Sequence, residues 1–217
     1  MNLQNYYYYF KSAIPPKICD EIIKFGLEQK SQIALTGIVK DDDNPTEEEI
    51  KELSSLRKSD VVWMDGAWIY KEIHPYIETA NAEAGWNFDW DFSEACQFTI
   101  YEKNQYYGWH YDSAPEPYDD PNNLNIHGKI RKLSVTISLS DESEYEGGDF
   151  EFDFRNHFKD DKFNKFLELD KTVHSVPEIR PKGSIVVFPS FVWHRVKPVT
   201  SGTRYSLVIW NLGKPFR

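Results

Sequence analysis

The chain has 217 residues and a globular composition, with 40% hydrophobic, 28% charged and 16% aromatic residues and a formal net charge of −10 at pH 7. This length is sufficient for one well-buried domain. The acidic balance, without a basic cluster, argues against nucleic acid as the main partner, because a negative surface repels phosphate backbones.

Location and redox state follow from simple features. The sequence shows no basic and apolar regions of a signal peptide, and no apolar run reaches the length of a membrane span. We therefore expect a cytoplasmic protein with no membrane partner. The two cysteines, Cys19 and Cys96, are expected to be reduced thiols.

The first 90 residues are expected to form a strand and supporting helices. Residues 3–10 are rich in tyrosine and favour an edge strand. A helix is predicted to start at Pro15 and Pro16, because proline is tolerated in the first helical turn. Its apolar residues follow helical spacing and form a stripe of Ile18, Ile22, Ile23 and Phe25.

Three further segments lie between this helix and residue 90. Residues 41–49 are acidic and polar, which predicts a mobile loop leading into a short helix. Residues 57–63 favour a strand. Residues 67–84 are predicted to form a helix that Gly85 ends, because apolar side chains recur on one face.

From about residue 90 the pattern changes to short strands separated by turns. The predicted strands span residues 95–101, 107–111, 131–140, 148–154, 178–180, 184–189, 192–198 and 204–212. Helices followed by strands favour an α+β, mainly β protein, in which two antiparallel sheets form a jelly roll. We expect a single domain over residues 1–217, with helical support in residues 1–90 and the jelly-roll core in residues 91–213.

The strand predicted over residues 131–140 alternates between apolar and polar side chains. Its apolar face includes Leu133, and its polar face carries Ser134, Thr136 and Ser138. The polar face of an ordinary half-buried strand meets solvent. In a jelly roll it could instead line the central cavity, which makes Thr136 and Ser138 candidates for binding a cofactor.

The stretch His110-Tyr111-Asp112 carries the clearest chemical signal. If it lies in a strand, His110 and Asp112 project from the same face, two residues apart. A second imidazole must come from a strand folded opposite, and His194 is the natural candidate. Two histidines and one carboxylate leave other metal positions open, as in non-haem Fe(II) oxygenases. The alternative is a solvated strand face, because His-x-Asp is a weak motif on its own.

Arg204 lies in a stretch that otherwise reads as a largely buried strand. A buried guanidinium needs a fixed anionic partner, and arginine can grip a carboxylate with two parallel hydrogen bonds. Ser206, two residues on, would add a hydroxyl on the same face. A dicarboxylate such as 2-oxoglutarate fits this arrangement. The alternative is an internal salt bridge to an aspartate or glutamate.

Together these motifs resemble those of the Fe(II)/2-oxoglutarate oxygenases, and within them the prolyl 4-hydroxylase-like branch. The resemblance covers roughly residues 90–212. The matching positions, in chain order, are Glu94, Gln97, Tyr101, His110, Asp112, Arg131, Gly147, Gly148, His194, Arg204 and Trp210.

The resemblance implies a role for each group of residues. His110, Asp112 and His194 would be the iron ligands. Arg204 would hold the distal carboxylate of 2-oxoglutarate, where most members of this branch carry lysine, and Tyr101 would help to bind the same cosubstrate. The positions that surround the substrate proline in peptidyl-prolyl members are matched by Tyr107, Arg131, Glu94 and Trp210. A weaker match likens Arg57-Lys58-Ser59 to residues that flank the peptide groove.

The resemblance further implies an α+β double-stranded β-helix that hydroxylates prolyl residues of a peptide or protein. Fe(II), 2-oxoglutarate and O2 would be required, with ascorbate as an optional addition. Independently of the resemblance, the loop 113–128 is rich in proline, aspartate and asparagine, and we expect it to close over the site as a lid. Two alternatives are an oxygenase acting on a free amino acid or small metabolite, and a non-catalytic jelly roll that binds a metal or an anion.

Overall fold

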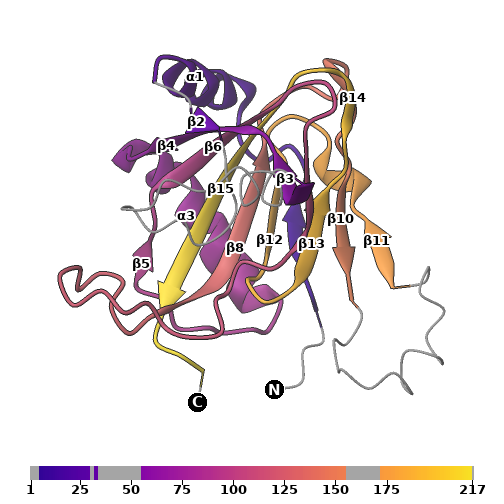
Figure 1. Ribbon diagram of the computed structural model, residues 1–217. Helices are drawn as coiled ribbons and strands as arrows, with labels where there is room; N and C mark the ends of the chain where they lie inside the picture. The colour runs from indigo at the N-terminus through magenta and orange to yellow at the C-terminus, as the bar shows by residue number, and fades with distance from the viewer. Residues whose placement is uncertain (1–4, 30–31, 34–54, 155–171, 217) are drawn as a thin grey trace.

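The computed structural model describes residues 5–29, 32–33, 55–154 and 172–216 (Figure 1). Within these residues the strands form two large sheets and a short ribbon, and all paired strands run antiparallel. This architecture confirms the α+β, mainly β prediction. The loop predicted over residues 41–49 lies outside the described part of the chain.

The main sheet has eight strands. They are β1 (Tyr8–Phe10), β2 (Gln32–Ile33), β4 (Asp60–Met64), β5 (Phe92–Ser93), β6 (Cys96–Tyr101), β8 (Ile130–Ser138), β12 (Ile185–Pro189) and β15 (Arg204–Gly213). Their order is β1-β12-β8-β15-β6-β4-β2, and β5 pairs with the end of β15. The long strands β8 and β15 therefore lie side by side at the centre.

The second sheet has five strands in the order β11-β10-β13-β7-β3. They are β3 (Arg57–Lys58), β7 (Tyr106–His110), β10 (Phe150–Asp153), β11 (Val173–Ser175) and β13 (Trp193–Val196). The ribbon pairs β9 (Tyr145–Gly147) with β14 (Val199–Gly202). An apolar cluster joins the two large sheets, because Phe150 and Phe152 of β10 pack with Phe188 of β12.

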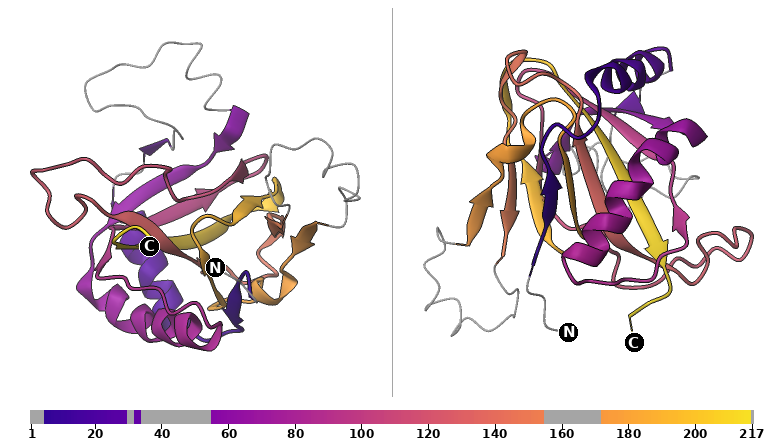
Figure 2. Two further views of the ribbon diagram at one scale, coloured as in Figure 1. Left: turned by 90° about the horizontal axis from the view of Figure 1, so that it is seen from below. Right: turned by 180° about the vertical axis from the view of Figure 1, so that it is seen from behind.

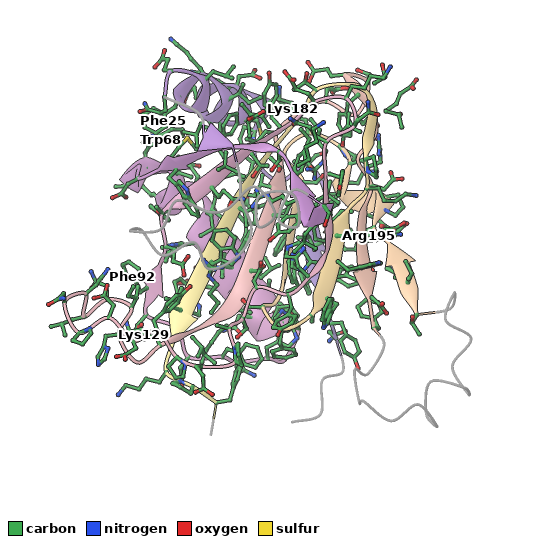
Figure 3. The ribbon with its side chains drawn as sticks, in the orientation of Figure 1. Phe25, Trp68, Phe92, Lys129, Lys182 and Arg195 are labelled. Carbon is green, nitrogen blue, oxygen red and sulfur yellow. The ribbon has the colours of Figure 1, made fainter. Side chains whose placement is uncertain are left out.

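Two helices cover the back of the main sheet. The helix α3 (Ala67–Glu83) lies across that face and buries Ile69, Ile73, Ile77 and Ala80 (Figure 2). The helix α1 (Pro16–Leu27) starts at the predicted proline pair and buries Cys19 and Ile22. Phe25 of α1 meets Trp68 of α3 in a T-shaped contact, with ring centroids 6.3 Å apart and planes at 70° (Figure 3).

The two faces of the main sheet differ in chemistry. Leu133, Val135 and Ile137 of β8 belong to the core shared with the helices. The opposite face of the strand carries Ser134, Thr136 and Ser138, which are all buried. The polar face therefore does not meet solvent; it lines the space between the two sheets.

Most of the predicted strands are present, but two predictions are wrong. Residues 57–63 do not form one strand, because the chain passes from the second sheet to the main sheet at the buried Ser59. Residues 178–180 are not a strand either; Pro177 opens a 3-10 helix there (Pro177–Ile179), and proline cannot donate a ladder hydrogen bond. Strands missed from the sequence are short: β2, β5, β9, β11 and β14.

Several smaller predictions can also be compared with the structure. The predicted edge strand is present in β1, at one end of the main sheet. Gly85 has a φ of +75° just after α3, as expected for a residue that ends a helix. Cys19 and Cys96 are buried free cysteines, as predicted. No helix of the described residues is long and apolar enough to cross a membrane.

We expect Gly183→Ala to destabilise the protein more than Gly85→Ala, although both glycines have a positive φ. A Cβ at Gly183 would lie 2.1 Å from the backbone oxygen of Ile14, whereas one at Gly85 would meet nothing within 4 Å. The left-handed conformation costs about 1–2 kcal/mol at either site, and overpacking adds about 1–3 kcal/mol at Gly183. Urea unfolding measures both losses, and equal losses would contradict this prediction.

Candidate metal centre

Three predicted ligands meet between the two sheets. His110 ends β7, and its register partner on β13 is His194. Asp112 lies just beyond β7 rather than within it, and its backbone N–H donates to the carbonyl of Ser190 at 2.8 Å. The ligand atoms of all three residues lie within 4.8 Å of one another. Asp112 Oδ1 is 3.7 Å from His110 Nε2, and Oδ2 is 3.6 Å from His194 Nε2.

Backbone carbonyls orient both imidazoles. The Nδ1 of His110 is 2.8 Å from the carbonyl oxygen of Gly108, and the Nδ1 of His194 is 2.9 Å from that of Val192. A carbonyl only accepts hydrogen bonds, so each Nδ1 carries the proton and donates. Each Nε2 then presents its lone pair toward Asp112. Metal-binding histidines are commonly oriented by this kind of hydrogen bond.

Asp112 is held by hydroxyl groups. Ser134 on β8 donates to Asp112 Oδ2 at 2.7 Å, and its hydroxyl lies 2.9 Å from that of Ser190. These serines were not among the predicted site residues. The alternation of β8 could have identified Ser134, because it shares a face with Thr136 and Ser138.

The electrostatics favour the metal-binding forms. Burial and the neighbouring His194 lower the pKa of His110 to about 3. Burial alone would raise the pKa of Asp112, but the two histidines, Arg131 and the hydrogen bond from Ser134 lower it. His110 is therefore neutral and Asp112 ionised, as metal coordination requires. Two imidazole nitrogens and one carboxylate oxygen are the donor set of non-haem Fe(II) sites, so the residues present fit an iron ion.

Arg204 at the start of β15 lies on the same interior face. It is 3% exposed, and its Nη1 is buried without a hydrogen-bond partner. No carboxylate of the described residues forms an ion pair with it, which disfavours the internal salt bridge considered above. Its guanidinium carbon lies 5.4 Å from the ring centroid of Tyr101, its register partner on β6.

Three predicted hydroxyl groups lie near Arg204 in the sheet. Ser206 of β15 pairs with Ser138 of β8. Thr136 of β8 pairs with Val208, which is two residues further along β15. All three side chains are buried. A guanidinium with an unsatisfied N–H, surrounded by hydroxyl groups, fits the carboxylate of a dicarboxylate ligand.

Three of the four predicted substrate residues form one cluster. Arg131 and Glu94 make a two-pronged ion pair, with Nε 2.9 Å from Oε1. The guanidinium carbon of Arg131 lies 4.0 Å from the ring centroid of Trp210. Tyr118, from the loop between β7 and β8, donates its hydroxyl to Glu94 at 3.0 Å. Burial would lower the pKa of Arg131, but its bonds to Glu94 raise it.

The fourth, Tyr107, lies against the metal centre. Its ring stacks on His110 with centroids 3.4 Å apart and planes 8° apart. On the other side, the guanidinium carbon of Arg57 lies 4.4 Å from the Tyr107 centroid. Burial raises the pKa of the Tyr107 phenol, which keeps it protonated. Trp63 on β4 extends the aromatic surface, with its ring 5.9 Å from that of Trp210; sequence reasoning did not identify it.

A family model described as the 2OG-Fe(II) oxygenase superfamily matches residues 96–211. The chain is 37% identical over 105 residues to a PKHD-type hydroxylase of Synechococcus sp. (strain CC9902). The matched segment covers 48% of this chain and 35% of that protein. It is 34% identical over 114 residues to PKHD-type hydroxylase YbiX of Escherichia coli O157:H7, and this match covers 52% of this chain and 40% of that protein. The chain thus spans less than half the length of these curated relatives.

Solved structures share the fold along nearly the whole chain. A Pseudomonas putida prolyl-4-hydroxylase matches with a TM-score of 0.63 and 16% identity, over 96% of this chain and 93% of that one. A viral collagen prolyl hydroxylase from Paramecium Bursaria Chlorella virus-1 matches with a TM-score of 0.60 and 16% identity, over 97% of both chains. At this identity the likeness establishes the fold.

We expect Ser134→Ala to weaken divalent-metal binding about 10–100-fold, because Asp112 loses the hydroxyl that orients it. Asp112→Asn should weaken binding further, since it removes a charged ligand. Ser138→Ala is the matched control, as it deletes a hydroxyl from the same strand face without touching Asp112. Calorimetric titration with Mn(II) measures all three, and wild-type affinity in Ser134→Ala would contradict the orienting role.

Proposed function

The chain belongs to the 2OG-Fe(II) oxygenase superfamily, and from this membership we propose that it is a dioxygenase that hydroxylates a prolyl residue of a peptide or protein. One observation carries the proposal. The neutral, correctly oriented His110 and the ionised Asp112 share an interior face with Arg204, a buried guanidinium that has no anionic partner among the described residues. A metal site and a carboxylate site side by side are what a keto-acid cosubstrate requires.

His110, Asp112 and His194 would hold the iron. When bound, Fe(II) and 2-oxoglutarate supply the oxidative chemistry: one oxygen atom of O2 enters succinate as CO2 is released, and the other enters the substrate C–H bond. The three side chains come from adjacent strands and the turn after β7, and their ligand atoms lie within 4.8 Å of one another. Such a set would leave other positions of a bound metal for the cosubstrate and O2.

Arg204 would bind the distal carboxylate of 2-oxoglutarate. Its unsatisfied Nη1 supplies a donor, and Ser206 with Tyr101 would complete the carboxylate site. Thr136 and Ser138 line the same face and would contact the body of the cosubstrate. A buried charged pair of this kind fixes the orientation of the cosubstrate and forms in a site from which water is largely excluded.

Tyr107, Arg131, Glu94 and Trp210 would surround the substrate. The ion pair between Arg131 and Glu94 fixes the guanidinium over Trp210, so the indole presents a rigid apolar surface. Proline is a compact apolar ring that packs well on aromatic faces. The fold shared with prolyl hydroxylases supports the same substrate class, and we extend the proposal to ascorbate as an optional addition to the reaction.

We expect Arg204→Gln to weaken 2-oxoglutarate binding at least about thirty-fold, because it removes one partner of a buried charge pair. An anaerobic titration of the Fe(II)-loaded protein follows binding through the charge-transfer absorption of the complex. Mn(II) affinity should not change, and Arg204→Lys should recover part of the loss. No absorption band in the folded, iron-loaded wild type would favour the non-catalytic alternative.

We expect Trp210→Ala to lower hydroxylation of a prolyl peptide while leaving iron and 2-oxoglutarate binding close to wild type. The reason is that Trp210 contacts Arg131 and Trp63 rather than the metal ligands. Arg131→Ala should act in the same direction, although it also destabilises the protein by leaving Glu94 unpaired. Mass spectrometry of the peptide and succinate formation measure the two effects; normal hydroxylation by both variants would overturn the substrate assignment.

A further inference from the structure

Four buried side-chain atoms of the described residues have no hydrogen-bond partner: Arg57 Nη2, Arg204 Nη1, Trp210 Nε1 and Glu178 Oε2. Three of them are donors, and they belong to residues around the proposed active site. Leaving a buried donor unsatisfied is costly, so each of these three donors indicates a position built for an acceptor that a ligand brings. The proposed cosubstrate satisfies Arg204 and leaves the other two donors.

Arg57 is the more informative of these two because it is charged. The residue is 5% exposed. Its Nε donates to the hydroxyl of Ser59 at 2.8 Å, and its Nη1 donates to Oε1 of Gln97 at 3.3 Å. Both partners are neutral, and no carboxylate in the described residues lies within ion-pair distance. Arg57 therefore carries a buried positive charge that its hydrogen bonds do not neutralise.

The other charges of the proposed site balance without Arg57. Arg131 is neutralised by Glu94. Fe(II) and Arg204 supply three positive charges, and Asp112 with the two carboxylates of 2-oxoglutarate supplies three negative ones. The loaded site thus keeps one uncompensated positive charge, at Arg57. A substrate that brings one negative charge would remove this imbalance.

Arg57 is also linked to the candidate metal centre through Tyr107. It lies on β3, and its register partner on β7 is Tyr107. The Tyr107 ring is sandwiched between the guanidinium, 4.4 Å away, and the His110 imidazole, 3.4 Å away. Only one aromatic ring therefore separates Arg57 from a metal ligand.

We propose that Arg57 binds a carboxylate of the substrate, so that the hydroxylated residue carries a free carboxylate close to the reacting carbon. A peptide carbonyl would accept a hydrogen bond from Nη2 but leave the positive charge of Arg57 unbalanced. A carboxylate would accept the hydrogen bond and also neutralise the charge, and it suits the planar donor edge of arginine. The substrate class is then a carboxy-terminal prolyl residue or a free amino acid such as proline. This inference rests on the proposed function, and it excludes internal prolines as the preferred substrates.

The test compares acetyl-Ala-Ala-Pro bearing a free carboxylate with the same peptide as its carboxy-terminal amide, and with free L-proline. Binding is measured by calorimetry under nitrogen to the full chain loaded with Co(II) and 2-oxoglutarate. Hydroxylation is measured separately with Fe(II) and O2 by mass spectrometry. Wild type is expected to bind at least one of the two acids at least about thirty-fold more tightly than the amide. Tighter binding of acetyl-Ala-Ala-Pro would identify a peptide terminus as the ligand, and tighter binding of L-proline would identify a free amino acid.

Arg57→Gln should abolish this preference, and Arg57→Lys should retain part of it. Lys58→Gln is the matched control, because it removes an exposed positive charge from the adjacent residue and should leave the preference unchanged. Binding of Fe(II) and 2-oxoglutarate, which does not involve Arg57, verifies that each variant is folded. If Arg57→Gln does not fold, the ratio of acid to amide binding in wild type and Arg57→Lys decides.

The outcomes separate this inference from the proposed function. Equal binding of acid and amide by wild type, no binding of either acid, or a preference that survives in Arg57→Gln would overturn the carboxylate site. Equal hydroxylation of acid and amide would overturn it as well, while the prolyl hydroxylase function stands. Acid-selective binding through Arg57 without hydroxylation of proline would support the carboxylate site and overturn the prolyl assignment.

Discussion

The antiparallel pairing of β7 with β13 is the contact on which the candidate metal centre depends. It places His194 opposite His110, although the two residues are far apart in the sequence. Side chains alternate between the faces of a strand, so a slip of one residue would turn His194 away from the site. The same strand β7 pairs with β3 on its other edge, which sets Arg57 beside Tyr107. The strand β7 and its neighbour β3 thus position His110, a proposed metal ligand, together with Tyr107 and the guanidinium of Arg57.

Three arginines lie around this centre, and they differ in their partners: Arg57 and Arg204 are buried, and Arg131 is half-buried. Arg131 has its own carboxylate in Glu94 and forms a fixed part of the wall. Arg204 and Arg57 have only neutral neighbours among the described residues, and each keeps one unsatisfied nitrogen. A folded protein bears the cost of an unpaired buried charge when the charge serves a ligand. The presence or absence of an internal counter-charge therefore separates Arg131 from the two arginines that we propose to bind ligands.

Much of the candidate site could be predicted, because the proposed chemistry requires rare residue types at fixed spacing. The His-x-Asp pair, the distal His194 and Arg204 stand out for this reason, and the alternation in β8 showed which hydroxyl groups share a face. The change of sheet at Ser59 could not be predicted, because residues 57–63 have the local pattern of one strand. The isolation of Arg57 was equally hidden: whether a charge has a partner is a property of the folded chain.

The position of Arg131 illustrates how one irregularity completes the site. By simple alternation Arg131 would share the face of Leu133 and point into the core beneath the helices. The pairing of β8 with β15 instead shifts register there, with Leu133 opposite Asn211 and Arg131 opposite Leu212, so that Lys132 is an extra residue. Such a bulge re-aims the side chains beyond it. Arg131 consequently lies over Trp210, on the face that carries Ser134, while Leu133 remains in the core. A regular strand would have buried the guanidinium among aliphatic side chains, away from Glu94, and the wall of the proposed substrate site would not form.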